Sequence, residues 1–425
     1  MSSRDHVDEN ESKSAGKADA STLLTLNAGS SSLKFAVFST EAPSNDTSSA
    51  ERQPKRIVAG DVSRIGHSGA TLRISKAGEA KVETACDAPD QARALEVVLE
   101  KLDALAPLSR VVAVGHRIVH GGRDNDGARL VTKELLEELN DLSSLDPNHM
   151  PSELALVRAM QKKLADIPHV ACFDTAFHRT MPRVARLVSI DRKYEEEGIE
   201  RYGFHGLSYA FVVSELERVA GREAAQGRLV VAHLGSGSSL AAIHHGRSVD
   251  TTMGFTPTSG VMMGTRSGDL DPGILLYLLR KHGLDSKALD ELVNARSGLL
   301  GVSGTSSDVR DLLEREATDE RAKEALALFC YQVKKSIGAL ATVLGGIDTL
   351  VFTGGIGENS PEIRARIADG LEHLGITLDE TSNEKNSAVI SQHRSSKTVR
   401  IVQTDEEVIL ARQTAQIVAS QKEPS

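Results

Sequence analysis

Tryptophan is absent from this 425-residue sequence, and the other large aromatics are scarce, with five tyrosines and nine phenylalanines. Aliphatic side chains must therefore fill most of the core. Cysteine is also rare, since Cys86, Cys172 and Cys330 are the only three. An odd number of cysteines without any CxxC pair argues against a disulfide framework or a thiolate metal site, and it favours a reducing compartment.

Positive charge is in deficit. The formal net charge is −9, so no excess of lysine and arginine is available to neutralise nucleic-acid phosphates, and we expect no nucleic-acid partner. No apolar run approaches the roughly 20 residues that a membrane helix needs, and the first residues lack the apolar core of a signal peptide. We therefore expect a cytoplasmic protein without membrane contact.

The chain is too long for one ordinary hydrophobic core, so two domains are expected. Residues 1–20 are polar and are expected to be disordered. Beyond them, strand-like runs alternate with stretches of helical periodicity, which indicates an α/β architecture. The predicted strands cover residues 22–27, 32–38, 111–114, 169–173, 229–233, 349–352 and 398–402, and the predicted helices cover 91–105, 132–142, 152–165, 208–220, 272–282, 286–296 and 320–344.

Two segments resemble each other across half of the chain. Residues 26–38 read LNAGSSSLKFAVF, and residues 233–246 read HLGSGSSLAAIHHG. In both, a strand-like run meets a Gly/Ser turn, and Ser-Ser-Leu opens a second apolar run. The similarity is either a coincidence between two small-residue turns or the result of a duplicated fold with one phosphate-binding hairpin in each lobe. In the second case a nucleotide would lie between the lobes.

Three turns have phosphate-binding character, because glycine and short side chains let backbone N–H groups approach phosphate oxygens closely. They span residues 27–32, 235–239 and 354–360, and the chain lacks a Walker A or GxGxxG motif. Lys34 follows the first turn, where it either reaches a phosphate or is simply solvated.

Four charged or titratable residues are candidates for chemistry at an anion. Arg117 in VGHRIVHGG can clamp a carboxylate or phosphate bidentately, and Arg266 is the one basic residue of a long irregular stretch, 253–271, of the kind that is usually functional. Asp174 follows a buried strand-like run, where it is either a catalytic carboxylate or a helix cap. His205 lies between two glycines in RYGFHG, either presented to a site or hydrogen-bonded within its loop. Phosphoryl transfer needs such a set, because it depends on positioning and on neutralising charge.

Nine segments, taken in order along the chain, resemble the acetate kinase family. They are LTLNAGSSSLKFAVF, GHRIVHGG, FDTAFHRTMP, RYGFHG, HLGSGSS, SVDTTMGFTPTSGVMMGTRSGDLDP, SGLLGVSGTSSDVRDL, FTGGIGENS and TDEEVILAR. Together they run from Leu24 to Arg412, and several are long and rarely shared with other families. The resemblance is therefore specific and covers nearly the whole chain.

This resemblance implies an α/β fold of the acetate/sugar kinase–actin–heat-shock chaperone superfamily, with two duplicated ribonuclease H-like lobes and the nucleotide in the interdomain cleft. The first lobe would comprise residues 21–174 with 404–425, and the second lobe, residues 175–403, would bind the nucleotide and form the dimer interface. The implied activity is reversible, direct in-line transfer of the ATP γ-phosphate to acetate, giving acetyl phosphate and ADP. Mg²⁺ would be the cofactor, with Mn²⁺ as an alternative, and the enzyme would be a homodimer.

Matching the motifs position by position implies a set of site residues. Arg117, His205 and Arg266 would stabilise charge on the moving phosphoryl group, with Arg117 also binding the acceptor carboxylate, and Asn27 and Glu406 would hold the metal. The acceptor pocket would be formed by Val119, Asn148, Phe204 and Pro257. The ATP-binding residues would be Lys34, His233, Leu234, Gly235, Ser236, Gly237, Asp308, Val309, Arg310, Gly355, Ile356, Gly357, Glu358 and Asn359.

Asp174 matches the residue usually called the proton donor or acceptor of the family. A carboxylate substrate with a pKa of about 4 is already ionised at neutral pH, so it needs no general base to become a nucleophile. We therefore interpret Asp174 as a residue that orients Arg117 or a metal-bound water.

Three positions depart from the family pattern. Ser236 and Asp405 both replace asparagine, and Asn148 stands where leucine is usual in the acyl pocket. A polar group in a methyl pocket lowers affinity unless it is hydrogen-bonded, so Asn148 leaves the acid open between acetate, propionate and a slightly more polar acid. The alternatives are a propionate or butyrate kinase and, in a different class, a chaperone-like or regulatory ATP-binding protein on the same fold.

Overall fold

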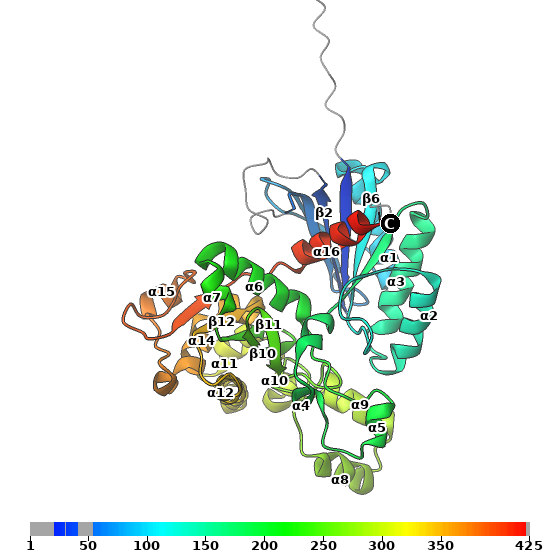
Figure 1. Cartoon of the computed structure of the whole chain (residues 1–425). Coiled ribbons are helices and arrows are strands. Elements are labelled where there is room, and N and C mark those ends of the chain that lie inside the picture. The colour runs from blue at the N-terminus through cyan, green and yellow to red at the C-terminus, as the bar shows by residue number, and fades with distance from the viewer. Residues whose placement is uncertain (1–20, 30, 41–53, 422–425) are drawn as a thin grey trace, which may run out of the picture.

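The computed structural model describes residues 21–29, 31–40 and 54–421, which form two α/β lobes (Figure 1). The segment 1–20, expected to be disordered, lies outside these residues. None of the described helices is long and apolar enough to cross a membrane.

The first lobe is built on an eight-stranded sheet with the strand order β5-β4-β3-β2-β1-β6-β8-β7. β1, β2 and β3 form an antiparallel meander, whereas β6 and β8 extend the sheet beyond β1 as parallel strands. The carboxyl ends of β1, β6 and β8 therefore meet at one edge. The strands are β1 Thr22–Ala28, β2 Ser32–Ser39, β3 Arg56–Ser63, β4 Thr71–Lys76, β5 Val82–Ala85, β6 Val111–Ile118, β7 Arg129–Leu130 and β8 His169–Phe173.

The second lobe repeats this plan in a five-stranded sheet with the order β11-β10-β9-β12-β13. β9, β10 and β11 form the antiparallel meander, and β12 and β13 continue it in parallel on the other side of β9. The β1–β2 and β9–β10 hairpins thus occupy equivalent places, which confirms the duplication predicted from the two similar segments. The strands are β9 Leu229–Leu234, β10 Ser238–His244, β11 Arg247–Thr251, β12 Thr349–Thr353 and β13 Thr398–Ile401.

Helices flank both sheets, and the last helix, α16 (red in Figure 1), packs on β1 and β6 of the first sheet. The α-helices are α1 Gln91–Leu105, α2 Lys133–Asp141, α3 Met150–Lys163, α4 Arg183–Arg186, α5 Lys193–Glu196, α6 Gly206–Ala220, α7 Arg222–Gln226, α8 Pro272–His282, α9 Ser286–Ala295, α10 Gly298–Ser303, α11 Val309–Arg315, α12 Glu320–Val343, α13 Gly354–Asn359, α14 Pro361–Ala368, α15 Glu380–Glu384 and α16 Glu406–Ser420. Single 3₁₀ turns are η2 Leu108–Arg110, η3 Leu142–Ser144, η4 Ala176–Thr180 and η5 Glu372–Leu374.

Local chemistry explains why the predicted helices begin where they do. Asp90 caps α1 by accepting a hydrogen bond from the Arg93 N–H at 2.8 Å, and α1 covers residues 91–105 as predicted. Asp271 caps α8 in the same way, with Pro272 at its first position, where proline loses no hydrogen bond. The seven predicted helices agree with the structure to within two residues at each end.

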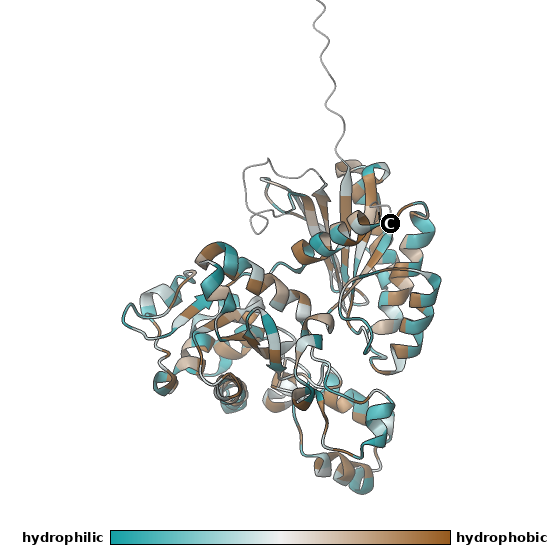
Figure 2. Ribbon diagram, in the orientation of Figure 1, coloured by the Kyte–Doolittle hydropathy of each residue, from teal (hydrophilic) through white to brown (hydrophobic). Residues whose placement is uncertain are grey.

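One hydrophobic cluster joins the two lobes. It contains Phe38 and Val170 from the first sheet, Val231 from the second, Leu207 from α6 and Leu410 from α16, all buried. α6 and α16 pack against each other within it. Apolar residues concentrate along the strands, whereas the outer helices of the first lobe carry many polar residues (Figure 2).

Two parts of the fold differ from the prediction. The antiparallel extension formed by β3, β4 and β5 was not expected, because β5 is fully exposed and β4 buries only Leu72, so neither shows a clear alternating pattern. Residues 354–359, interpreted as a turn, form the short helix α13 directly after β12. The irregular stretch is as predicted, since no regular element lies between Thr251 and Pro272.

Candidate active site

Arg117 lies near the end of β6, and Asp174 directly follows the neighbouring parallel strand β8. The Arg117 Nη2 and Nε groups both donate to Asp174 Oδ2, at 2.6 and 3.1 Å. Arg117 Nη1 donates to the Ala28 carbonyl at 3.0 Å, at the end of β1. The sheet thus brings together a predicted arginine and a predicted carboxylate at one edge, as parallel topology requires.

The surroundings of Arg117 and Asp174 determine how the two side chains are charged. Burial by itself lowers the pKa of Arg117, but the carboxylates of Asp174, Glu153 and Glu406 outweigh that effect and raise it above its usual range. Burial raises the pKa of Asp174, and Arg117 offsets part of this rise. Asp174 Oδ1 is buried and has no hydrogen-bond partner within the described chain. The site therefore holds a permanent guanidinium beside one unused carboxylate oxygen.

Glu153 on α3 is a third member of this group, and sequence reasoning missed it. Its Oε1 lies 3.4 Å from Arg117 Nη1, and its Oε2 accepts from the Val119 N–H at 2.8 Å. Its side chain is 2% exposed, and burial raises its pKa to about 8 against the opposing effects of Arg117 and the Val119 N–H. The available signal was a glutamate on the apolar stripe of a helix, between Met150 and Val157.

The first hairpin meets the start of α16. The Asn27 amide nitrogen donates to Glu406 Oε2 at 2.8 Å and to Glu407 Oε1 at 3.4 Å. Burial raises the pKa of Glu406, but Lys34 and Arg117 outweigh this effect and lower it, so the carboxylate stays ionised. Burial lowers the pKa of Lys34, and Glu406 and Glu407 more than compensate.

These residues fit a divalent cation that is bound jointly with phosphate. Because Asn27 uses its amide nitrogen to hold the two carboxylates, its amide oxygen remains for a cation. Together with the oxygens of Glu406 and Glu407, it forms a set of hard donors, and Mg²⁺ is usually held by one or two carboxylates plus substrate phosphates. Within the described ranges, no group of three or more His, Cys, Asp or Glu residues could hold a metal ion by itself.

His205 faces the second hairpin from the start of α6. Its backbone is left-handed, with φ of 58°, a conformation that is uncommon outside glycine and asparagine. Its Nδ1 lies 2.9 Å from Ser239 Oγ, which also contacts the Tyr209 hydroxyl, and its ring stacks on that of His233 with centroids 4.3 Å apart. Burial, and then the nearby His233 and Arg117, lower the pKa of His205 well below its usual value, so the ring is neutral.

Arg266 faces the same hairpin from the irregular stretch. A β-carbon placed on Gly237 would lie 3.4 Å from His205 Nε2 and 3.5 Å from Arg266 Nη1, so both groups border this turn. In the part of the chain that the structure describes, the Arg266 guanidinium bonds to the Pro257 carbonyl at 3.1 Å and contacts Met263 Sδ. Burial lowers its pKa. The buried carboxylate of Asp146 offsets part of this effect, but no carboxylate is hydrogen-bonded to the Arg266 guanidinium in the described chain, unlike that of Arg117.

The third predicted phosphate segment abuts the second hairpin. Gly354 has φ of +76°, and a β-carbon there would lie 2.7 Å from the Leu234 carbonyl, so only glycine allows this approach. Glu358, predicted to contact the nucleotide, instead uses its Oε1 to accept from the Gly354 N–H at 2.9 Å and from the Thr404 N–H at 3.0 Å. In this structure Glu358 fastens the third segment to the residues that lead into α16.

Thr404 is linked to His233 through Ser208, and Asp405 is neutralised by Arg56. Ser208 Oγ lies 2.8 Å from His233 Nδ1 and 2.9 Å from Thr404 Oγ1. Asp405 caps α16, and both of its carboxylate oxygens accept from Arg56 Nη2 on β3. The negative charge that Asp405 brings next to Glu406 is therefore compensated locally by Arg56, a residue that sequence reasoning also missed.

The predicted residues 308–310 border the second hairpin from another side. A β-carbon on Gly264 would lie 3.3 Å from the Ser307 carbonyl and 3.4 Å from the Ser236 carbonyl. Asp308 caps α11 by accepting from the Arg310 N–H at 2.8 Å, and its carboxylate pairs with the exposed Arg310 guanidinium at 2.6 Å. This loop therefore lies close to Ser236, although its side chains pair with each other.

The acyl-pocket residues are brought together only in part. Val119 and Phe204 are buried in one hydrophobic cluster with Phe173, and Pro257 is also buried. Asn148 does not join this cluster and lies exposed in the turn before α3. The doubt about the acid that rested on a polar Asn148 in the methyl pocket therefore finds no support in its surroundings.

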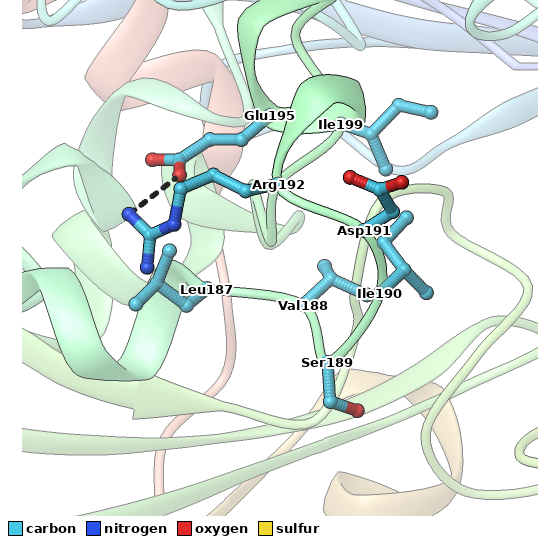
Figure 3. Close-up of a pocket in the computed structure, with 8 residues that line it drawn as sticks. All are labelled: Leu187, Val188, Ser189, Ile190, Asp191, Arg192, Glu195 and Ile199. Carbon is cyan, nitrogen blue, oxygen red and sulfur yellow. Dashed lines mark hydrogen bonds and ion pairs between the residues drawn. The ribbon is translucent and has the colours of Figure 1, made fainter.

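A cavity of about 320 Å³ lies elsewhere in the second lobe (Figure 3). The segment between α4 and α5 forms most of its wall, and Arg192 pairs there with Glu195 at 3.5 Å. None of the predicted site residues lines it; its walls are formed by Leu187, Val188, Ser189, Ile190, Asp191, Arg192, Glu195 and Ile199.

Two equivalent Gly/Ser hairpins, one in each of two repeated lobes and each flanked by a basic side chain, fit the class of two-lobed nucleotide-dependent phosphotransferases, because phosphoryl transfer needs positioned groups that offset phosphate charge. Comparison with known proteins agrees. The profile of the acetokinase family matches residues 22–412. The acetate kinase of Methylocella silvestris is 44% identical over 398 residues, which cover 92% of this chain and 96% of the relative.

Solved structures give the same answer. An acetate kinase from Porphyromonas gingivalis has a TM-score of 0.82 and 37% identity, covering 94% of this chain and 100% of that structure. A propionate kinase from Francisella tularensis has a TM-score of 0.84 and 32% identity, covering 93% of this chain and 100% of that structure. The chain belongs to the acetokinase family. The predicted family, duplicated two-lobed fold and kinase activity are thereby confirmed, and the family implies ATP and a divalent metal.

Proposed function

We propose that this chain is an acetate kinase, which reversibly transfers the γ-phosphate of ATP to acetate and gives acetyl phosphate and ADP. The proposal rests mainly on the side chains around Arg117. Its guanidinium is fixed by Asp174, and two residues further on Val119 is buried beside Phe204. A short carboxylate would place its oxygens against the guanidinium and its methyl group against the valine.

In the proposed in-line step, an acetate oxygen forms a bond to the γ-phosphorus while the bond from phosphorus to the bridging oxygen of ADP breaks. Charge on the transferred group is offset by Arg117 and Arg266. His205 is neutral, and with its Nδ1 accepting from the Ser239 hydroxyl, its Nε2–H would donate toward the same group. These three residues are the proposed source of transition-state stabilisation.

Asp174 acts in this proposal as an organiser and not as a base. Acetate is already ionised at neutral pH, and Asp174 Oδ2 is occupied by two N–H groups of Arg117. The unpartnered Oδ1 is left to orient a water molecule.

We assign the metal site to Asn27 and Glu406, with Mg²⁺ as the cofactor and Mn²⁺ as an alternative. Such a cation, bound with ATP, supplies neutralisation of phosphate charge. Asn27 presents its amide oxygen, and Glu406 presents a carboxylate kept ionised by Lys34 and Arg117.

The nucleotide is proposed to lie between the lobes, across the second hairpin and the third segment. We divide the chain into a first lobe of residues 21–174 with 404–425 and a second lobe of residues 175–403. The proposed ATP contacts are Lys34, residues 233–237, residues 308–310 and residues 355–359, with Glu358 acting through its hold on Gly354 and Thr404.

A homodimer is proposed from an apolar face of the second lobe. No side chain of α8 is buried, and Leu276 and Tyr277 are 53% and 55% exposed. An exposed group of large apolar residues of this kind marks an association surface. We further propose a cytoplasmic location, since Cys86, Cys172 and Cys330 are all unpaired, as a reducing compartment favours.

A coupled assay of ADP release tests the function. With ATP and Mg²⁺, we expect turnover that depends on acetate, and the ratio of kcat/KM values across acetate, propionate, butyrate and glycolate identifies the acid. A preference for propionate would favour the alternative suggested by the propionate kinase structure of similar fold. ATP turnover that is indifferent to every short carboxylate would instead support a regulatory ATP-binding protein.

A further inference from the structure

Glu153 connects the two parts of the site that must recognise the two ends of a short carboxylate. One of its oxygens lies 3.4 Å from Arg117 Nη1, and the other accepts from the Val119 backbone at 2.8 Å. Arg117 is the proposed contact of the acceptor carboxylate, and Val119 is the proposed contact of its methyl group. A single buried side chain thus spans both.

Its own position is rigid. Glu153 lies on α3, which packs on β6, the strand that carries Arg117. Its neighbours Leu154 and Val157 belong to the same hydrophobic cluster as Val119. A carboxyl group buried to this extent stays only where its oxygens are hydrogen-bonded, and both of them are.

We propose that Glu153 is a positioning residue for acceptor recognition: it ties the Arg117 guanidinium to the Val119 backbone, so that the carboxylate-binding and alkyl-binding groups keep a fixed separation. The inference rests on the proposed function, because it assigns Arg117 and Val119 to the acceptor. It is distinct from the role of Asp174, which holds the opposite edge of the same guanidinium.

The ionisation of Glu153 makes the proposal testable through the pH dependence of KM for acetate. The charged groups that face it are Arg117 from β6, Asp174 after β8 and Asp146 before α3. Burial raises the pKa of Glu153 to about 8, so the group is largely protonated at neutral pH and ionises as the pH rises through that value. Above pH 8 it adds a negative charge beside the acceptor arginine, which repels an anionic substrate.

The test compares Glu153→Ala, Glu153→Gln and a surface control, Glu137→Gln, whose side chain is 68% exposed on α2. In Glu153→Ala we expect KM for acetate to rise about 10-fold or more, the effect of losing a hydrogen bond to a charged group, while KM for ATP changes less than about twofold. Glu153→Gln keeps an acceptor for the Val119 N–H but turns its NH2 group toward Arg117, so it is expected to recover only part of this loss. Glu137→Gln is expected to match the wild type.

The pH profile separates positioning from general structural support. KM for acetate in the wild type is expected to rise between pH 7 and 9, and in Glu153→Gln it is expected to stay flat. The proposal would be overturned if Glu153→Ala raised KM for acetate and KM for ATP equally. It would also be overturned if KM for acetate in Glu153→Gln rose between pH 7 and 9 as much as in the wild type. If Glu153→Ala does not fold, the Glu153→Gln profile still decides. A wild type without acetate-dependent ADP release would refute the proposed function itself, whereas normal wild-type turnover with an unaffected acetate KM in Glu153→Ala would refute only this inference.

Discussion

Replacing Arg117 or Arg266 by alanine is expected to lower kcat to a similar extent but to change stability very differently. Both guanidiniums are proposed to offset charge on the moving phosphoryl group, and a well-placed arginine of this kind contributes about 10³-fold or more to the rate. Their surroundings differ, since Arg117 pairs with two buried carboxylates and Arg266 bonds to a carbonyl. The two variants therefore separate catalysis from folding.

The magnitude for Arg117→Ala follows from what the change leaves behind. Asp174 is 1% exposed and would lose its cationic partner, whereas Glu153, with its raised pKa, is largely neutral at pH 7. Breaking a buried pair from one side costs about 3–5 kcal/mol. At roughly 2–4 °C per kcal/mol for lobes of this size, Tm would fall by about 6–20 °C. Arg266→Ala removes a cation near the buried carboxylate of Asp146, but Asp146 keeps its hydrogen bond with His149 at 2.9 Å, so Tm is expected to change by less than about 4 °C.

The assay combines turnover of ATP and acetate with thermal unfolding by circular dichroism, at pH 6 and pH 8. The stability gap between Arg117→Ala and the wild type should narrow at pH 6, because the unpaired carboxyl of Asp174 can then take up a proton in the folded state. Arg117→Lys serves as the matched control; it keeps a positive charge and most of the stability, but not the bidentate geometry. Near-normal turnover in either alanine variant, or an equal loss of Tm in both, would refute the reasoning.

Three further predictions concern other parts of the structure. Arg56→Ala should lower Tm by about 2–4 °C, as expected for a partly exposed ion pair worth up to about 1 kcal/mol. Adding Asp405→Asn should restore Tm. A double-mutant cycle in thermal unfolding that shows no coupling between Arg56 and Asp405 would contradict this. Val119→Ala should shift the ratio of kcat/KM for propionate to that for acetate about 10-fold toward propionate. Asn148→Leu, at an exposed position, should shift this ratio less than about twofold. A larger effect of Asn148→Leu would show that Asn148 contacts the acid after all. Stability measured by urea unfolding should fall as the pH drops from 6.5 toward 4, by up to about 1.4 kcal/mol per pH unit for each buried histidine, because the unfolded state binds protons that the folded state does not. A flat profile would show that these histidines are already accessible. Burial lowers the pKa values of His116, His120, His169, His178, His205 and His233.

Much of the fold follows from local patterns in the sequence. The two Gly/Ser hairpins and the run of helices were predictable because alternation, helical periodicity and capping residues such as Asp90 and Asp271 act over a few residues. β3 to β5 were not, since β3 and β4 are mostly half-buried and β5 is exposed, so none of the three carries a clear alternating pattern. The helix at residues 354–359 was missed because its three glycines resemble a turn, and its first turn is held by Glu358.

The candidate site shows the same division. Arg117 and Asp174 could be predicted, since both stand at strand ends where parallel sheets collect functional groups. Glu153 and Arg56 could not, because each acts through a contact with a residue distant in sequence: Glu153 reaches Val119 from 34 positions away, and Arg56 reaches Asp405 from 349. The place of Glu153 on the apolar stripe of α3 indicates a buried carboxyl, but it does not identify Val119 as the partner.

The segment before α16 is where the two lobes are tied together at the site. Thr404 is bonded to Glu358 and Ser208 of the second lobe, while two residues later Glu406 is bonded to Asn27 of the first. A phosphotransferase must close over its substrates to keep water from the reactive acyl phosphate. If Thr404 stays fixed to the second lobe during closure, the change in backbone angles must fall between it and Glu406. Glu406, the carboxylate proposed for the metal site, then lies next to the pivot and is bonded to Asn27 of the first hairpin.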